Sequence, residues 1–387
     1  MKKTCIAMAV LGAMAGSAFA ASVTMYGVVD AGLNFKSIAG DDVPAFEQHS
    51  DSSFGLDSGL NSGSRFGIKG VEELGNGWNV GFVLENGFSS DTGEMGDDRI
   101  FGREAHLFVE GPYGKLGMGR VGALSSDVGS YGITGAISPF GTGWGDFIGN
   151  HDLVFAAKPT RLDNAITYVS PEFAGLRVHA QYSFQNDSAD GKENKNTADR
   201  YAGIGFTYQY GKFGAVALFD YLDEGRRYDE GVLQGEYLGE DQKTVTLGVN
   251  YDCGYATSYL AAQYFKDANW VGGSGFDGMG YTLGDNMISP KGEGKNAGDI
   301  DGFGIVLGVA VPVWGGNAYG MAGYMDADSD RTGYDVKRWT VGGGYDYPLS
   351  KRTTVYGGAA WVQDSVSLDQ DRDPTAAQVV VGMKHTF

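Results

Sequence analysis

Hydrophobic and polar residues alternate with a period of two along most of this chain. Residues 64–88, SRFGIKGVEELGNGWNVGFVLENGF, contain two such runs around a short turn at 74–77. One face of each run is apolar, while the opposite face carries Arg65, Lys69 and Glu85. Because successive side chains of a β-strand point to opposite sides, the pattern predicts a hairpin with one apolar face and one charged face.

The same alternation predicts sixteen strands and no long amphipathic helix. The predicted strands lie near 22–36, 61–74, 77–90, 99–111, 114–122, 163–170, 175–186, 199–210, 213–222, 242–252, 255–267, 299–311, 316–327, 336–347, 352–364 and 376–387.

The connections between these strands alternate between short and long. The short ones hold Gly, Pro, Asn or Asp, which suit tight turns. The long ones are polar, lie near 37–60, 91–98, 123–162, 187–198, 223–241, 268–298, 328–335 and 365–375, and the third is the longest. Transmembrane β-barrels segregate short turns and long loops in this way, and closure leaves no unpaired edge in lipid. The chain is therefore predicted to be all-β, a 16-stranded antiparallel transmembrane β-barrel.

The last segment, AQVVVGMKHTF, supports a barrel strand. Val379, Val381, Met383, His385 and Phe387 share one face, and the chain ends on an aromatic residue. Aromatic side chains at strand ends suit the interface between hydrocarbon and water.

The first twenty residues, MKKTCIAMAVLGAMAGSAFA, have the features of a secretory signal peptide. Lys2 and Lys3 form a basic start, an apolar stretch follows, and Ala18-Phe19-Ala20 resembles a cleavage site. We expect residues 1–20 to be removed and residues 21–387 to form a single barrel domain. Cys5 would leave with the signal, so Cys253 could form no intramolecular disulfide.

Composition narrows the function further. The mature chain would carry 27 basic and 48 acidic residues, a balance of −21, which argues against nucleic acid as a partner. Glycine, at 64 residues, is more than twice as common as the usual level of about 7%. The five histidines show no paired metal spacing, and no G-x-S-x-G nucleophile motif occurs. We expect no enzyme activity, no metal and no cofactor.

Six stretches together resemble the Gram-negative general porins of the beta-proteobacterial and neisserial type. They are VTMYGVVDAGL, SRFGIKGVEELGNGW, FGREAHLFVEGPYGKLGMGR, NAITYVSPEFAGL, YPLSKRTTVYGG and the terminal GMKHTF. The resemblance implies a homotrimer in the outer membrane, in contact with lipid and lipopolysaccharide. It also implies that the third loop folds into the lumen and narrows it.

The resemblance also places basic residues of the barrel wall opposite acidic residues of the third loop. The basic positions map onto Arg65, Arg120 and Arg161, with Arg103 and Lys69 as further members. Many relatives carry Pro-Glu-Phe-Gly in the loop, where this chain has Ser138-Pro139-Phe140-Gly141 without the glutamate. Asp127 and Asp146 are then the candidate acids, with Asp152 as a further one.

The expected function is passive diffusion of small hydrophilic solutes and ions through a water-filled channel. Pore width and lining charges would select the solutes. The arginines favour anions at the narrowest point, whereas the overall negative charge favours cations at the mouth. A substrate-specific channel and a surface adhesin built on the same barrel are the alternatives, and an outer-membrane enzyme is a further class.

Overall fold

The computed structural model describes thirteen stretches of the chain. They are 22–39, 51–141, 144–149, 151–156, 158–186, 198–223, 228–229, 232–233, 241–268, 271, 300–329, 334–367 and 373–387. The predicted signal peptide at 1–20 and much of the long loops lie outside them.

The described residues form nineteen strands and three short 3₁₀ helices. The strands are β1 (Ser22–Ala39), β2 (Asp51–Ser58), β3 (Arg65–Gly75), β4 (Trp78–Gly87), β5 (Glu104–Gly111), β6 (Gly114–Gly122), β7 (Arg161–Val169), β8 (Leu176–Ser183), β9 (Arg200–Tyr210), β10 (Phe213–Asp223), β11 (Tyr228–Asp229), β12 (Val232–Leu233), β13 (Gln242–Asp252), β14 (Thr257–Ala268), β15 (Ile300–Val313), β16 (Gly316–Ser329), β17 (Tyr334–Pro348), β18 (Thr353–Ser367) and β19 (Thr375–Thr386). The helices are η1 (Gly96–Asp98), η2 (Thr134–Ile137) and η3 (His151–Val154). None of the helices in the described stretches is long and apolar enough to cross a membrane.

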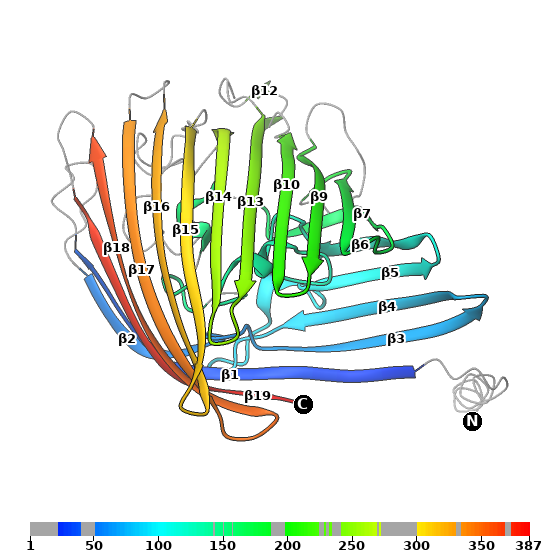
Figure 1. Cartoon of the computed structure of the whole chain (residues 1–387), viewed down its shortest axis with the longest axis horizontal. Coiled ribbons are helices and arrows are strands. Elements are labelled where there is room, and N and C mark those ends of the chain that lie inside the picture. Colours follow the sequence, from blue (N-terminus) through cyan, green and yellow to red (C-terminus); the bar gives the residue numbers. More distant parts are fainter. Residues whose placement is uncertain are drawn as a thin grey trace.

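Sixteen antiparallel strands close into one barrel, as the alternation predicted. Each strand pairs with its neighbour along the chain, and β1 closes the sheet against β19, with Phe35 opposite Val379. The second barrel strand is interrupted: β2 pairs with one half of β1 and β3 with the other. The pair β11–β12 forms a separate two-stranded sheet. Figure 1 shows the short turns that join β15 to β16 and β17 to β18 at the same end of the barrel as the C-terminus.

The strand boundaries agree with the prediction to within a few residues, with two corrections. Residues 51–58, assigned to the first long loop, form β2, and the loop predicted at 223–241 contains the β11–β12 hairpin. The interruption between β2 and β3 explains the first error. Asp30 accepts hydrogen bonds from the backbone N–H groups of Asn61 and Ser62 at 3.1 and 2.8 Å, so a buried carboxylate on β1 satisfies the unpaired backbone there.

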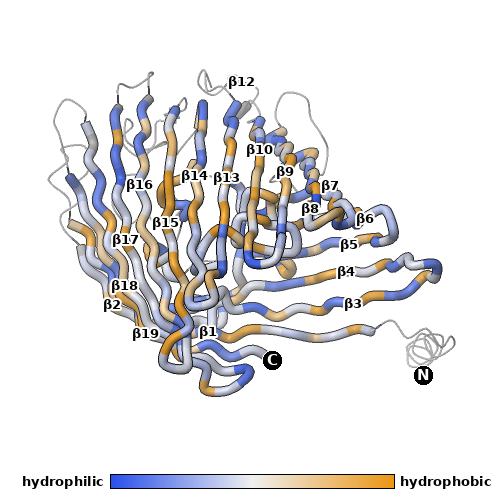
Figure 2. The backbone as a smooth tube through the Cα atoms, viewed as in Figure 1, coloured by the Kyte–Doolittle hydropathy of each residue, from blue (hydrophilic) through white to orange (hydrophobic). Residues whose placement is uncertain are grey.

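The outer face of the barrel is apolar. Large exposed hydrophobic residues recur at every second position, as at Leu247 and Val249 on β13 and Val379 and Val381 on β19. Figure 2 shows hydrophobic and polar residues alternating along the strands. Exposed apolar side chains in this pattern suit contact with hydrocarbon.

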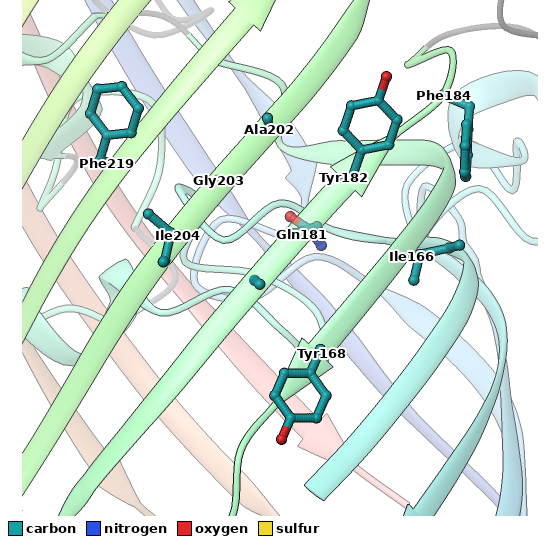
Figure 3. A pocket seen from close by; sticks show the side chains of 10 residues that line it. Ile166, Tyr168, Gln181, Tyr182, Phe184, Ala202, Gly203, Ile204 and Phe219 are labelled. Atoms are coloured by element: carbon teal, nitrogen blue, oxygen red, sulfur yellow. The ribbon is translucent and has the colours of Figure 1, made fainter.

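A groove of about 560 Å³ lies on this outer face across β7 to β10. Tyr168, Tyr182 and Phe219 stand around it, and Ala202 and Gly203 lie between them (Figure 3). Its lining is almost entirely aliphatic and aromatic, so it belongs to the apolar outer surface and not to the lumen.

The long connection between β6 and β7, residues 123–160 and hereafter loop 3, packs against the other face of the sheet. Buried side chains of loop 3 lie against inner-face glycines, with Ile137 at Gly248 on β13 and Trp144 at Gly344 on β17. This face is opposite to the exposed apolar residues, so the described part of loop 3 lies inside the barrel. In Figure 1 the segment appears behind strands β13 to β15.

The close approach of loop 3 explains part of the glycine excess. A Cβ atom at Gly304 would lie 1.8 Å from the carbonyl oxygen of Val154, closer than any side chain tolerates. The inner wall is therefore flat where the loop crosses it, and the loop contributes the buried apolar residues of the interior, including Ile148, Leu153 and Phe155.

We predict that replacing Gly248 by valine destabilises the barrel. The new Cβ would lie 2.5 Å from Cγ2 of Ile137, and overpacking of this kind costs about 1–3 kcal/mol. The midpoint of heat unfolding in detergent, followed by gel mobility, should fall. Gly320→Val is the matched control. Gly320 pairs with outward-facing Val309, and a Cβ atom at Gly320 would lie 3.6 Å from Cγ1 of Val309, an ordinary contact distance. Equal midpoints for the two variants would contradict the packing described here.

Candidate functional site

Basic side chains gather on the inner wall formed by β3 to β7 and the segment between β4 and β5. On β3 the period of two places Arg65 there, because its neighbour Phe66 faces outward and is 43% exposed. On β6 a β-bulge between Gly119 and Val121 interrupts the alternation and turns Arg120 inward. The predicted basic residues Arg65, Lys69, Arg103, Arg120 and Arg161 all belong to this wall, and Arg99 joins them.

Glu85 on β4 holds two of these arginines. Its carboxylate accepts a hydrogen bond from Nε of Arg103 at 2.6 Å, and Nε of Arg65 lies 3.7 Å away. The hydroxyl of Tyr26 donates to the same carboxylate at 2.9 Å. Arg65 is fixed further by Nη1, which donates to the carbonyl oxygen of Gly63 at 2.8 Å. A carboxylate between two guanidinium groups fixes both cations and lowers the local positive charge.

Asp163 on β7 plays the same part for a second pair. Nη1 of Arg99 and Nη1 of Arg120 each lie 2.6 Å from one of its oxygens. Nε of Arg120 also donates to the carbonyl oxygen of Gly102 at 2.6 Å. The two carboxylates and four arginines form adjoining charged clusters on one side of the lumen.

Arg161 and Lys69 are held less tightly. The Nε atom of Arg161 is buried and has no hydrogen-bond partner among the residues that the structure describes. The charges that act on Arg161 include those of Arg103, Asp97 and Arg120. Lys69 lies with its Nζ 5.0 Å from the centroid of the Tyr26 ring. Both side chains therefore add positive charge to the wall, and within the described stretches neither forms an ion pair with a carboxylate.

The acids of loop 3 contact other cations. Asp146 forms an ion pair with Lys36 of β1. Asp127 lies near Asp152, His151 and Lys158 of the same loop, and Nζ of Lys158 is 2.7 Å from Oδ1 of Asp152. The structure thus places the predicted basic residues together, but the carboxylates that bind them are Glu85 and Asp163 of the wall.

The environment of the loop acids shifts their pKa values in opposite directions. Burial raises the pKa of Asp127, and the negative charge of Asp152 adds to the effect. Burial would also raise the pKa of Asp152, but the charges of Lys158 and His151 outweigh it and leave that pKa lowered. The fold therefore favours the ionised form of Asp152 and opposes the ionised form of Asp127.

Three functional residues were missed in the sequence, although two of them carried a signal. Glu85 stands on the charged face of its strand, and Asp163 lies two residues after Arg161, on the same face by the period of two. Arg99 lies in a connection without regular periodicity, so the sequence offers no comparable signal for it.

Comparison with known proteins places this site in a known fold. The family model described as Gram-negative porin matches residues 7–367. An outer membrane porin protein of Bordetella pertussis is 32% identical over the whole of both chains. Two solved structures share the fold, each covering 95% of this chain and 100% of its own length. One is an anion-selective porin from Comamonas acidovorans, with a TM-score of 0.65 and 22% identity. The other is the trimer form of an outer membrane protein of Vibrio cholerae, with a TM-score of 0.58 and 16% identity.

We predict that Asp127→Asn raises the thermal stability of the barrel at neutral pH. Because the folded-state pKa of Asp127 is raised, the ionised carboxylate opposes folding above that pKa, and the penalty disappears as the pH falls below the unfolded value. The unfolding midpoint at pH 7 should rise by roughly 2 °C, with no difference from wild type near pH 3, where Asp127 is protonated.

Asp91→Asn removes the same charge from an exposed position and serves as the control. A lower midpoint for Asp127→Asn than for Asp91→Asn at pH 7 would contradict the assigned environment.

Proposed function

The chain belongs to the Gram-negative porin family, and from that premise we propose that it forms a passive, water-filled diffusion channel. The solutes are small, hydrophilic molecules and ions, and the membrane is the outer membrane of a Gram-negative bacterium. Transport needs no chemical step, so the protein is not an enzyme. The observation that carries this proposal is the closed sixteen-stranded barrel with an apolar outer face and charged groups on its inner wall.

The narrowest part of the channel is proposed to lie between loop 3 and the arginine wall. Barrels of sixteen to eighteen strands are wide enough to leave an aqueous channel. The packing of loop 3 against the inner faces of β13, β15 and β17 supports a channel narrowed from that side. The opposite side is then lined by Arg65, Arg103, Arg120, Arg161 and Lys69, with Glu85 and Asp163 among them.

We propose a preference for anions at this constriction. Four arginines share two wall carboxylates, while Arg161 and Lys69 add further positive charge. The acids Asp127 and Asp146 have cationic neighbours of their own, so their effect on a passing ion is reduced. Fixed charges close to the path of an ion set selectivity more strongly than distant loop charges, which salt screens.

The assembly and the route to the membrane are part of the same proposal. Residues 1–20 direct export and are then removed, leaving residues 21–387 as one barrel domain. The barrel assembles as a homotrimer, in line with the trimer form of the Vibrio cholerae structure. Its outer surface contacts membrane lipid and lipopolysaccharide.

Planar-bilayer recording of the purified protein tests the channel itself. We expect stepwise increases in current that are ohmic at low voltage, because a fixed aqueous pore conducts without a transport cycle. Membranes that stay silent while the protein inserts as a folded barrel would contradict the channel. Absence of conductance except in the presence of one particular solute would favour a substrate-specific channel instead.

Reversal potentials in a salt gradient test the role of Glu85. Glu85→Gln removes one wall carboxylate and leaves Arg65 and Arg103 without their shared partner. One unit charge acting on an ion at about 8 Å through water contributes about 0.5 kcal/mol. Its removal favours an anion and disfavours a cation by this amount, so the anion-to-cation permeability ratio should rise roughly fivefold. Glu172→Gln removes a carboxylate from an exposed turn and should leave the ratio unchanged. An equal ratio in both variants would contradict the proposed constriction.

A further inference from the structure

Three glutamines on the inner wall hold the backbone of loop 3 in the same way. They are Gln181 on β8, Gln263 on β14 and Gln378 on β19, and each is at most 4% exposed. In each case Oε1 accepts a hydrogen bond from a backbone N–H of the loop, and Nε2 donates to the wall. A neutral amide can do both at once without burying a charge.

Gln181 holds the start of the loop. Its Oε1 accepts from the N–H of Leu124 at 2.8 Å. Its Nε2 donates to Oγ1 of Thr167 at 2.8 Å and to the carbonyl oxygen of Gly122 at 3.0 Å. Because a backbone N–H can only donate and a carbonyl oxygen can only accept, the orientation of this amide is fixed by its partners.

Gln378 holds the far turn of the loop, on the other side of the barrel. Its Oε1 accepts from the N–H groups of both Asp146 and Phe147, at 3.0 and 2.9 Å. Its Nε2 donates to Oδ1 of Asn34 on β1 at 3.0 Å. Next to it, the N–H of Gly145 donates to the carbonyl oxygen of Leu60 at 2.6 Å.

Gln263 and Arg338 hold the returning arm. Oε1 of Gln263 accepts from the N–H of Ala156 at 2.8 Å, and its Nε2 donates to Thr246 at 2.8 Å. Nη1 of Arg338 donates to the carbonyl oxygen of Leu153 at 2.7 Å. The rest of the guanidinium forms a two-point ion pair with Asp364, at 2.7 Å for each bond, and both side chains are almost fully buried.

We propose that Gln181, Gln263, Gln378 and Arg338 are positioning residues that fix loop 3 against the inner wall and thereby set the width of the channel. All four contact the loop through its main chain, so they determine where the backbone of the loop lies. The contacts lie at the start of the loop, at its far turn and in its returning arm, which prevents one end from swinging into the lumen while the other stays attached. This inference rests on the channel function proposed above.

Single-channel recording of two separate variants tests the proposal, with a matched control. Gln378→Met and Gln263→Met keep the length of the side chain and remove its hydrogen bonds. A typical hydrogen bond contributes about a factor of five to an equilibrium, so partial closures should become roughly fivefold more frequent in Gln263→Met and more frequent still in Gln378→Met. Gln209→Met changes an exposed glutamine near the end of β9, whose Nε2 donates to the carbonyl oxygen of Gly211, and should behave as wild type.

Folding of each variant is checked first by heat-dependent gel mobility. Folded variants that match wild type in closure frequency and unit conductance would overturn the proposal, although the wild-type conductance would still support the channel. If the protein were not a channel, the wild-type protein itself would give no conductance, which is a different result from unchanged variants.

Amide hydrogen exchange of the wild-type protein gives a test that needs no variant. The N–H groups of Leu124, Phe147 and Ala156 should exchange as slowly as those of the barrel strands. They should exchange at least tenfold more slowly than the N–H of Gly129, an exposed residue of the same loop. Slow exchange at all three positions supports the proposed role of the glutamines, even if both glutamine variants fail to fold. Exchange of Phe147 and Ala156 as fast as that of Gly129 would overturn it.

Discussion

Closure of the sheet is the constraint on which the rest of this structure depends. A strand in hydrocarbon cannot leave its backbone groups unpaired, and the pairing of β1 with β19 removes the last free edge. Closure gives the sheet two faces with opposite environments. The outer face carries exposed apolar residues such as Leu247 and Val381, and the inner face is left to water, to charged side chains and to loop 3.

Different strands of the inner face carry out different tasks. Glycines such as Gly248 and Gly304 flatten the far wall and allow the loop to pack closely, while glutamines receive its backbone N–H groups. The wall from β3 to β7 carries the arginines and their carboxylates Glu85 and Asp163. Loop 3 reaches part of this wall as well, where Ser130 donates to Glu104 of β5. The apolar packing of the loop at β13, β15 and β17 thus lies on strands other than those that carry the arginines.

The sequence was sufficient for the architecture, because alternation and turn residues are local signals. It predicted sixteen strands, the inward direction of Arg65 and the tight turn before Trp78, where Gly75, Asn76 and Gly77 all have positive φ. It could not predict the interruption of the second strand, since that depends on Asp30 reaching the backbone of Asn61 from another strand.

Contacts between distant segments account for the rest of what the sequence did not reveal. The arginine partners depend on register across several strands, and Asp163 meets Arg99 only because β7 lies beside β6 and near the segment before β5. The glutamines that hold loop 3 are separated by 82 and 115 positions along the chain, without any shared local motif. Single residues of this kind acquire a role only when the barrel brings them to one loop.

Permeation of sugars of increasing size into liposomes that contain the purified protein tests the central claim most directly. If loop 3 narrows a sixteen-stranded barrel from one side, swelling rates should fall steeply from monosaccharides to trisaccharides, while ions still pass. A rate that hardly depends on size across this series would mean an unobstructed lumen. That result would contradict the placement of loop 3 on which the account is built.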